Sequence, residues 1–423
     1  MKNRSFVLHG DIAYSTTDRR LQTQKDGYLV VLDGLVKGVY PELPAEYRSL
    51  PLSEEKGKLI VPGLTDLHVH APQYSFRGNG MDLRLLEWLE TYTFPEESKY
   101  QDLAYADKAY GHFVDDLRKT FTTRACIFGT LHKEATLLLA EKLSKTGLIT
   151  YVGLVDMDRN SPDFLRFPSV EKALSDTEEY IQKIRDIDGV TPIITPRFTP
   201  SCTDELMEGL GNIQKKYGLK AQSHLDENPS EVAWVKELAP WSTSYADAYD
   251  RFGMLEDSIM AHCVYLTPEE KELLLSRGTY VAHCPDSNIN LTSGIAPIKE
   301  FLEAGMHVGL GSDVAGGTHL NLFYQASLAI QMSKARVLYL NDPMPLVAEE
   351  AFYLATLGGG SFFGKVGTFL EGYEADILVL DDLGTYPTAK DLSIANRVER
   401  FLYLGQEEAL KAKYVAGNPI DLK

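Results

Sequence analysis

The chain has 423 residues, of which 44% are hydrophobic and 24% are charged, and its formal net charge at pH 7 is -18. These values are ordinary for a globular protein, and no apolar run reaches the roughly 18 residues of a membrane-spanning helix, so we expect no membrane partner. The acidic balance argues against a nucleic-acid partner, because Lys and Arg supply most of that affinity. The 4 cysteines form no CxxC pair, which argues against a disulfide framework or a cysteine zinc cluster.

The two ends of the chain share a pattern of short strands. The first ten residues lack the apolar stretch of a signal peptide, so we expect a cytoplasmic protein. Strands are expected at 28–32, with turns at Asp26-Gly27 and Asp33-Gly34, and again at 375–380 and 411–415. Because small sheets rarely stand alone, we predict that residues 1–60 and 365–423 pair into one small β-sandwich domain.

Residues 61–364 alternate short β-branched runs with longer helical patterns, which is typical of an α/β fold. Helices are expected over 204–217 and over 268–276, the second after an N-cap at Thr267. Eight strand-helix units predict a (β/α)8 TIM barrel. The eight expected strands are 58–68, 122–130, 148–156, 190–198, 219–224, 258–263, 279–283 and 307–311.

Two histidines, His68 and His70, stand at the end of the first of these strands with one residue between them. Side chains at positions i and i+2 of a strand share one face, so both imidazoles can reach one metal ion. The pair alone is weak evidence, since two strand histidines with ordinary hydrogen bonds have the same spacing. A parallel barrel gathers the carboxyl ends of all its strands on one face, so other ligands must end other strands.

The other strand ends supply the missing donors. His224 ends the fifth strand and Asp313 follows the eighth. Three imidazoles and one carboxylate, with a position left for water, make a catalytic metal site. The alternative is that His224 is a hydrogen-bonded core residue and Asp313 caps a turn. We predict a metal site of His68, His70, His224 and Asp313.

A proton carrier is expected beside this metal site. Glu227 lies three residues after His224, just off the strand, where its carboxylate can exchange protons with water. The adjacent Asp226 leaves this assignment open, and a helix-entry carboxylate is the alternative. His262 ends the sixth strand and is expected to hold the attacking oxygen by a hydrogen bond together with Asp313; a core histidine is its alternative.

The fourth expected strand carries no lysine. Barrel hydrolases with two metals commonly bridge them through a carbamylated lysine at that place, so one ion per chain is expected: zinc, or iron, since imidazole and carboxylate accept either. Arg197 is then free to meet a planar ring that bears a carbonyl, with a surface salt bridge as the alternative. His132-Lys133-Glu134 matches the H-x-E half of another zinc deaminase motif, but no P-C-x-x-C follows it.

Taken in order, the motifs resemble those of the amidohydrolase superfamily, in its single-metal aminohydrolase branch. They are Pro-Gly-x-x-Asp-x-His-x-His, His-x-x-Glu, the strand-six histidine, His-Cys-Pro-x-Ser-Asn and a terminal Ser-Asp. Within that branch the chain is similar to the guanine deaminase family from about residue 60 to 360. The matching segments are 71–78, 85–89, 92–95, 196–198 with 201–202, and 313–317. Leu225-Asp226 and Cys263 depart from the pattern of that family.

The resemblance implies a reaction, a substrate and an assembly. The reaction is hydrolysis of guanine to xanthine and ammonia, in which a metal-activated water attacks C2, Glu227 carries the proton, and His262 and Asp313 assist. The resemblance also implies a homodimer. The substrate contacts it implies are Arg197 at the carbonyl edge, Gln73 at ring nitrogens and Phe198, with Trp88 and His283 as further candidates on the substrate side.

Three alternatives remain open at this point. The chain could be another aminohydrolase, acting on cytosine, triazines or adenosine-like compounds. Arg197 and Gln73 argue against this, because a ring without the carbonyl leaves the guanidinium unpaired at a cost of ~1 to 3 kcal/mol. It could hydrolyse cyclic amides without releasing ammonia, or it could be an inactive barrel that serves as a binding protein.

Overall fold

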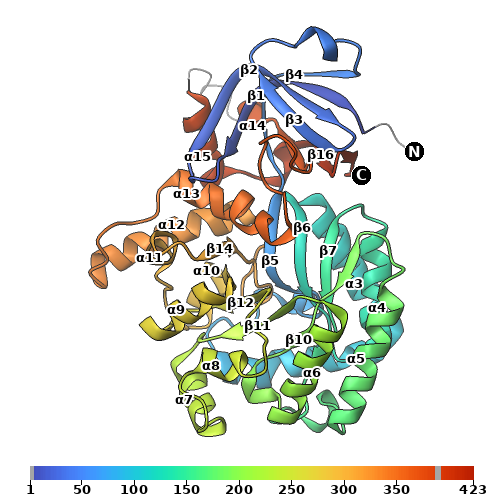
Figure 1. Cartoon of the computed structure of the whole chain (residues 1–423), viewed down its shortest axis with the longest axis vertical. Helices are drawn as coiled ribbons and strands as arrows, with labels where there is room; N and C mark the ends of the chain where they lie inside the picture. The colour runs from blue at the N-terminus through green and yellow to red at the C-terminus, as the bar shows by residue number, and fades with distance from the viewer. Residues whose placement is uncertain (1–3, 386–391) are drawn as a thin grey trace.

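The computed structural model describes residues 4–385 and 392–423 (Figure 1). In these ranges both chain ends enter a sheet at the top of the view, and a larger α/β body lies below it. No helix within the described ranges is both long and apolar enough to cross a lipid bilayer. The α-helices are α1 (Leu85–Trp88), α2 (Phe94–Ser98), α3 (Leu103–Lys119), α4 (Lys133–Ser144), α5 (Val170–Ile184), α6 (Asp204–Tyr217), α7 (Pro229–Leu238), α8 (Tyr245–Asp250), α9 (Pro268–Arg277), α10 (Pro285–Asn290), α11 (Ile298–Glu303), α12 (Leu322–Tyr339), α13 (Ala348–Tyr353), α14 (Asp382–Thr385) and α15 (Ile394–Leu404).

The larger body is built on an eight-stranded parallel sheet with the order β11-β12-β13-β14-β5-β6-β7-β9. Its two ends meet where Ile194 bridges Ala221, so the sheet closes into the TIM-type barrel that the sequence predicts. The strands are β5 (Leu64–His70), β6 (Thr122–Phe128), β7 (Ile149–Gly153), β9 (Val190–Pro192), β11 (Ala221–Leu225), β12 (Ser258–His262), β13 (Tyr280–His283) and β14 (His307–Leu310).

Three expected strands are divided in the structure. The segment 58–68 breaks at Gly63, where a Cβ would lie 2.3 Å from the Thr123 side chain. The residues before Gly63 belong to β4 (Leu52–Pro62) of the other sheet, and those after it form β5. The third and fourth strands end early and continue as a separate pair, β8 (Val155–Asp156) and β10 (Thr195–Pro196). Prolines in the fourth segment have no N–H to donate, which limits its ladder.

The predicted helices agree well with the structure, because their ends carry capping groups. The expected helix 204–217 is α6, and the Thr203 side chain accepts a hydrogen bond from the N–H of Leu206. The expected helix at 268 is α9, which begins after Thr267 and carries a full capping box with Glu270. Local hydrogen bonding therefore sets these two helix starts.

Both chain ends contribute to one seven-stranded sheet with the order β17-β16-β15-β4-β1-β2-β3. The expected turn at Asp26-Gly27 was wrong: both residues lie inside β2, where its pairing with β1 shifts register, whereas Asp33-Gly34 does join β2 to β3. The sheet has a core cluster of its own, and its description as a sandwich stays a prediction. The strands are β1 (Phe6–Ser15), β2 (Leu21–Leu32), β3 (Leu35–Tyr40), β4, β15 (Ile377–Leu380), β16 (Leu410–Val415) and β17 (Asn418–Pro419).

A buried lysine joins this sheet to the barrel. Lys413 of β16 is 1% exposed, and its Nζ donates to the carbonyls of Thr120 and Thr122, each at 2.9 Å, at the start of β6. Burial, aided by the Arg118 charge, lowers the pKa of Lys413 to about 7. Between pH 7 and its ordinary pKa of 10.5 the unfolded chain therefore binds the proton more readily than the folded one.

This difference predicts a pH-dependent contribution to stability. As the pH rises from about 7 to 10, wild-type protein should gain free energy of unfolding relative to Lys413→Met, by at most about 1.4 kcal/mol per pH unit. Thermal unfolding of both proteins across this range measures the effect. Lys411→Met, at an exposed position of the same strand, is the matched control. A constant difference between wild type and Lys413→Met would contradict the prediction.

Candidate active site

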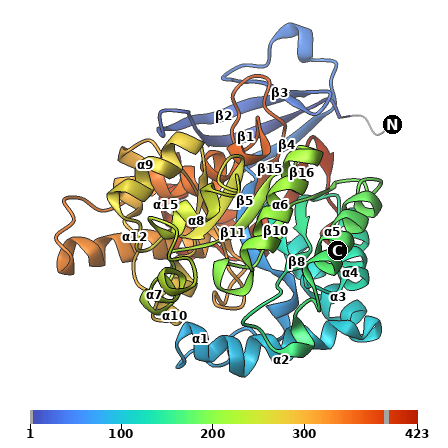
Figure 2. The same ribbon diagram turned by 60° about the horizontal axis from the view of Figure 1, so that its bottom comes forward.

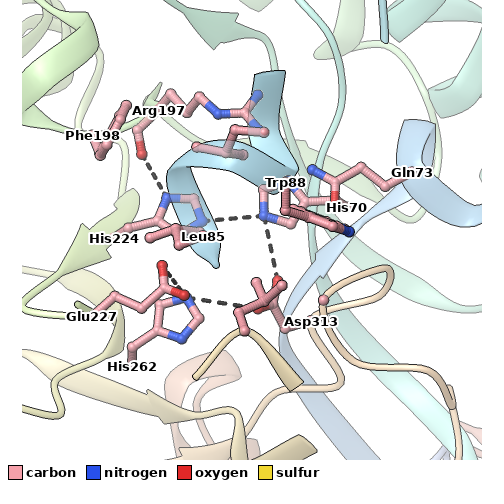
Figure 3. Close-up of a pocket in the computed structure, with 13 residues that line it drawn as sticks. His70, Gln73, Leu85, Trp88, Arg197, Phe198, His224, Glu227, His262 and Asp313 are labelled. Atoms are coloured by element: carbon pink, nitrogen blue, oxygen red, sulfur yellow. Dashed lines mark hydrogen bonds and ion pairs between the residues drawn. The ribbon is translucent and has the colours of Figure 1, made fainter. Parts of the chain in front are cut away.

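A cavity lies at the carboxyl ends of the barrel strands (Figure 3). Helices α1 and α2 lie on the side of the barrel away from the terminal sheet (Figure 2), and α1 supplies part of the wall. The lining residues are His70, Gln73, Leu85, Trp88, Leu89, Arg197, Phe198, His224, Glu227, His262, Leu291, Asp313 and Gly316.

At the floor of the cavity the structure brings together the four predicted donors of the metal site. The Nε2 atoms of His70 and His224 are 3.1 Å apart. The Oδ1 atom of Asp313 lies 3.1 Å from Nε2 of His68 and 3.5 Å from Nε2 of His70. His68 is fully buried and does not line the cavity itself. These donors come from β5, from β11 and from the loop after β14, so the barrel gathers them from three strand ends.

The ring orientations favour a cation among these donors. Nδ1 of His224 donates to the carbonyl of Arg197 at 2.6 Å, which leaves the lone pair of its neutral ring on Nε2, facing His70. Burial, and then the charge of His68, holds the pKa of both His70 and His224 well below the ordinary value. Within the described part of the chain, Nδ1 of buried His68 has no hydrogen-bond partner, and its Nε2 faces the carboxylate of Asp313. Imidazole nitrogens that crowd together beside one carboxylate fit a metal ion.

Asp313 is held in place by its neighbours. Its N–H donates to the carbonyl of His68 at 2.8 Å. The preceding Ser312 donates its N–H and hydroxyl to Asp66, at 3.0 and 2.5 Å, and Asp66 also accepts the N–H of His68. Burial opposes the ionised form, but the imidazoles of His68, His262 and His70 lower the pKa of Asp313. The carboxylate is thus available as an anionic donor.

Glu227 and His262 stand beside this donor group. Oε2 of Glu227 lies 3.5 Å from Nε2 of His262, and its Oε1 accepts a hydrogen bond from Ser293 at 3.1 Å. Burial, and then the Asp313 charge, raises the pKa of Glu227 to about 8. His262 meets the side-chain oxygen of Asn288 through Nδ1 at 2.8 Å, so its Nε2 faces the carboxylates. A carboxyl group with a raised pKa is suited to proton transfer near neutral pH.

The opposite wall of the cavity carries the predicted substrate contacts. Arg197, Phe198, Gln73 and Trp88 all line it, and all four are labelled in Figure 3. The sequence reasoning missed Glu97, a buried residue of α2 whose carboxylate contacts two of these side chains. The sequence did offer one indication of a role for Glu97, because this residue lies two positions after the segment 92–95 that matches the family.

His283 occupies a different place from the other candidates. It is 2% exposed at the end of β13 but does not line the cavity. Burial, and then the charge of His262, lowers the pKa of His283 to about 3, so the ring is neutral. The adjacent Asp226, which left the Glu227 assignment open, does not line this cavity either; it faces a separate one beside α7.

Comparison with known proteins agrees with this site. The sequence matches the amidohydrolase family over residues 59–419. The chain belongs to the amidohydrolase family. It is 42% identical over 377 residues to a guanine deaminase of Dictyostelium discoideum, covering 86% of this chain and 82% of that protein.

Two solved structures are similar to this chain over nearly its whole length. Guanine deaminase from C. acetobutylicum, with guanine bound in its active site, is 44% identical, with a TM-score of 0.95 over 99% of this chain and 100% of that one. Guanine deaminase from E. coli is 31% identical, with a TM-score of 0.88 over 98% and 99%. The resemblance expected from the sequence is confirmed, and the protein is a hydrolase acting on carbon–nitrogen bonds.

The donor group of this amidohydrolase predicts a stabilising divalent ion. Removing the ion with a chelator should lower the melting temperature, because a ligand present at a thousand times its Kd contributes about 4 kcal/mol. Re-addition of the ion should restore it. The variant His70→Ala should lose the response, and His112→Ala, at an exposed helix position, should keep it. Equal melting temperatures with and without chelator, on protein shown to contain metal, would contradict this prediction.

Proposed function

We propose that this amidohydrolase is a guanine deaminase, which hydrolyses guanine to xanthine and ammonia with one zinc ion per chain. The observation that carries the proposal is the juxtaposition, in one cavity, of the His/Asp donor group, a carboxyl group suited to proton transfer and a wall of Arg197 and Gln73. The relative with guanine bound in its active site supports the choice of substrate.

His68, His70, His224 and Asp313 would hold the metal ion. When bound, such an ion supplies Lewis acidity, which lowers the pKa of water toward about 7. Zinc agrees with imidazole and carboxylate donors, and iron is the other outcome of a metal analysis.

In the proposed reaction Glu227 moves the protons. Its carboxylate takes a proton from the attacking water and delivers it to the ring nitrogen next to C2, which makes C2 electrophilic. The second proton of the water goes to the leaving amine, so one water and one guanine give xanthine and ammonia. His262, through Nε2, and the second oxygen of Asp313 orient the water by hydrogen bonds. The separation of 3.5 Å between His262 and Glu227 supports this shared role.

The apolar and donor groups of the wall would position the ring. Arg197 would donate to the carbonyl oxygen of guanine, and Gln73 would bond ring nitrogens. Phe198 and Trp88 supply aromatic surface for the ring faces. We also propose a supporting role for His283, which would act on the site through His262.

The remaining expectations from the sequence stay proposals. They are a homodimer, a cytoplasmic location, the absence of nucleic-acid and membrane partners, and a division into a barrel domain of residues 61–364 and a small domain of residues 1–60 and 365–423. A run of exposed apolar side chains at the end of α12 supports the homodimer, since such patches mark interaction surfaces. They are Leu338, Tyr339, Leu340, Met344 and Val347.

The proton-carrying role predicts the behaviour of one variant. Glu227→Gln keeps the shape of the side chain but cannot take up a proton, so kcat should fall at least about a hundredfold while metal content stays at the wild-type level. Ammonia release and metal analysis on the same sample measure the two quantities. Glu237→Gln, on the exposed side of α7, should retain full activity. An active Glu227→Gln enzyme would reject the assignment.

A substrate panel tests the proposed function itself. Guanine should release one ammonia and one xanthine per turnover, whereas adenine, adenosine, cytosine and an aminotriazine should react at least about a hundredfold more slowly, because none of them places a carbonyl on a purine ring against Arg197 and Gln73 as guanine does. Ammonia assay and chromatography of the products check this. Faster release from another amine would replace guanine, and ring-opened product without ammonia would indicate a cyclic amide hydrolase.

A further inference from the structure

A buried carboxylate behind the substrate wall connects two of its side chains. Glu97 of α2 is 1% exposed. Its Oε2 accepts a hydrogen bond from Nη1 of Arg197 at 2.7 Å, and its Oε1 accepts one from Nε2 of Gln73 at 2.9 Å. Gln73 lies just after β5 and Arg197 just after β10, so Glu97 fixes two groups from different strands relative to each other.

The contact to Glu97 also decides which way the amide of Gln73 points. Its Oε1 accepts the N–H of Ala315 at 3.2 Å, two residues after Asp313. With Oε1 directed at a donor and Nε2 directed at a carboxylate, the amide has one orientation that satisfies both contacts. Without Glu97 the amide could turn over and offer a ring the opposite pattern of donor and acceptor.

The pair of Arg197 and Glu97 also sets the charge of the wall. The two side chains are 4% and 2% exposed, so water screens them little. A buried guanidinium without a partner would attract an anion strongly. Paired with Glu97, it still has hydrogen-bond donors to offer but carries no net charge as a unit. A neutral ring with a carbonyl can use those donors, whereas an anion gains little from them.

We propose that Glu97 is a positioning and specificity-determining residue, which orients Arg197 and Gln73 and makes the wall select neutral purines over anionic ones. The inference rests on the proposed function for its choice of purines. Glu97 does not touch the substrate in this proposal, because it does not line the cavity. It acts through Arg197 and Gln73 instead.

The experiment compares two purine probes that differ in charge. Hypoxanthine is neutral and urate is a monoanion near pH 7.5, and calorimetry gives the Kd of each for the metal-loaded enzyme. In Glu97→Gln we expect urate to bind about tenfold more tightly than in wild type and hypoxanthine about tenfold more weakly. The conservative Glu97→Asp keeps the charge and should keep the wild-type ratio of the two Kd values to within about threefold.

Two further variants make the result decisive. Glu96→Gln changes the neighbouring carboxylate, which bonds Lys99 and Tyr105 instead of the wall, and should leave both Kd values unchanged. If Glu97→Gln does not fold, Arg197→Gln supplies the comparison: it leaves the carboxylate, so urate should lose at least about tenfold more affinity than hypoxanthine. Equal changes for both purines would reveal a merely structural role and overturn the proposal.

The outcome is separable from that of the proposed function. Ammonia release from guanine by the wild-type enzyme decides the function, whereas the ratio of the two Kd values among the variants decides the role of Glu97. A wild type that binds purines without releasing ammonia would reject only the function. A wild type that releases ammonia from guanine but shows no preference between the two probes would reject only the role of Glu97.

Discussion

The rest of the site depends on buried imidazoles packed against one carboxylate. Buried nitrogens of His70 and His224 face each other at 3.1 Å, an arrangement that lets both rings offer a nitrogen to one point, as a metal ion requires. A parallel barrel produces this crowding, because it brings the ends of β5, β11 and β14 to the same rim. The carboxylate of Asp313 would then supply negative charge to a divalent ion bound there, as we propose.

One residue links this donor group to the substrate wall. The backbone carbonyl of Arg197 accepts the hydrogen bond that orients His224, while its side chain faces the cavity and bonds Glu97. A shift of this short segment would move a proposed metal ligand and a proposed substrate contact together. The bend between β10 and the following turn therefore positions both halves of the site, and Ser223 strengthens it by donating to the carbonyls of Pro196 and Arg197.

The sequence predicts much of this arrangement, for physical reasons that also explain the omissions. Apolar runs and capping residues locate the strands and helices, and the barrel geometry converts strand ends into a site, which brings His68, His224 and Asp313 together. Such patterns do not show which side chains contact each other when the residues lie far apart in the sequence. The break at Gly63 depends on Thr123, and the role of Glu97 depends on side chains 24 and 100 positions away.

The contacts that stabilise the fold and the residues of the candidate site lie at opposite ends of the barrel. Lys413 and the buried pair of Arg124 and Asp376 hold the terminal sheet to the amino-terminal half of β6. The cavity opens at the carboxyl ends of the strands, so these contacts lie at the other end of the barrel from Glu227. Replacing Lys413, Arg124 or Asp376 should therefore change the free energy of unfolding, whereas replacing Glu97 or Glu227 should change binding or catalysis in the cavity. The strands between the two ends of the barrel hold the side chains of the site in place but supply no reacting group from their amino-terminal halves.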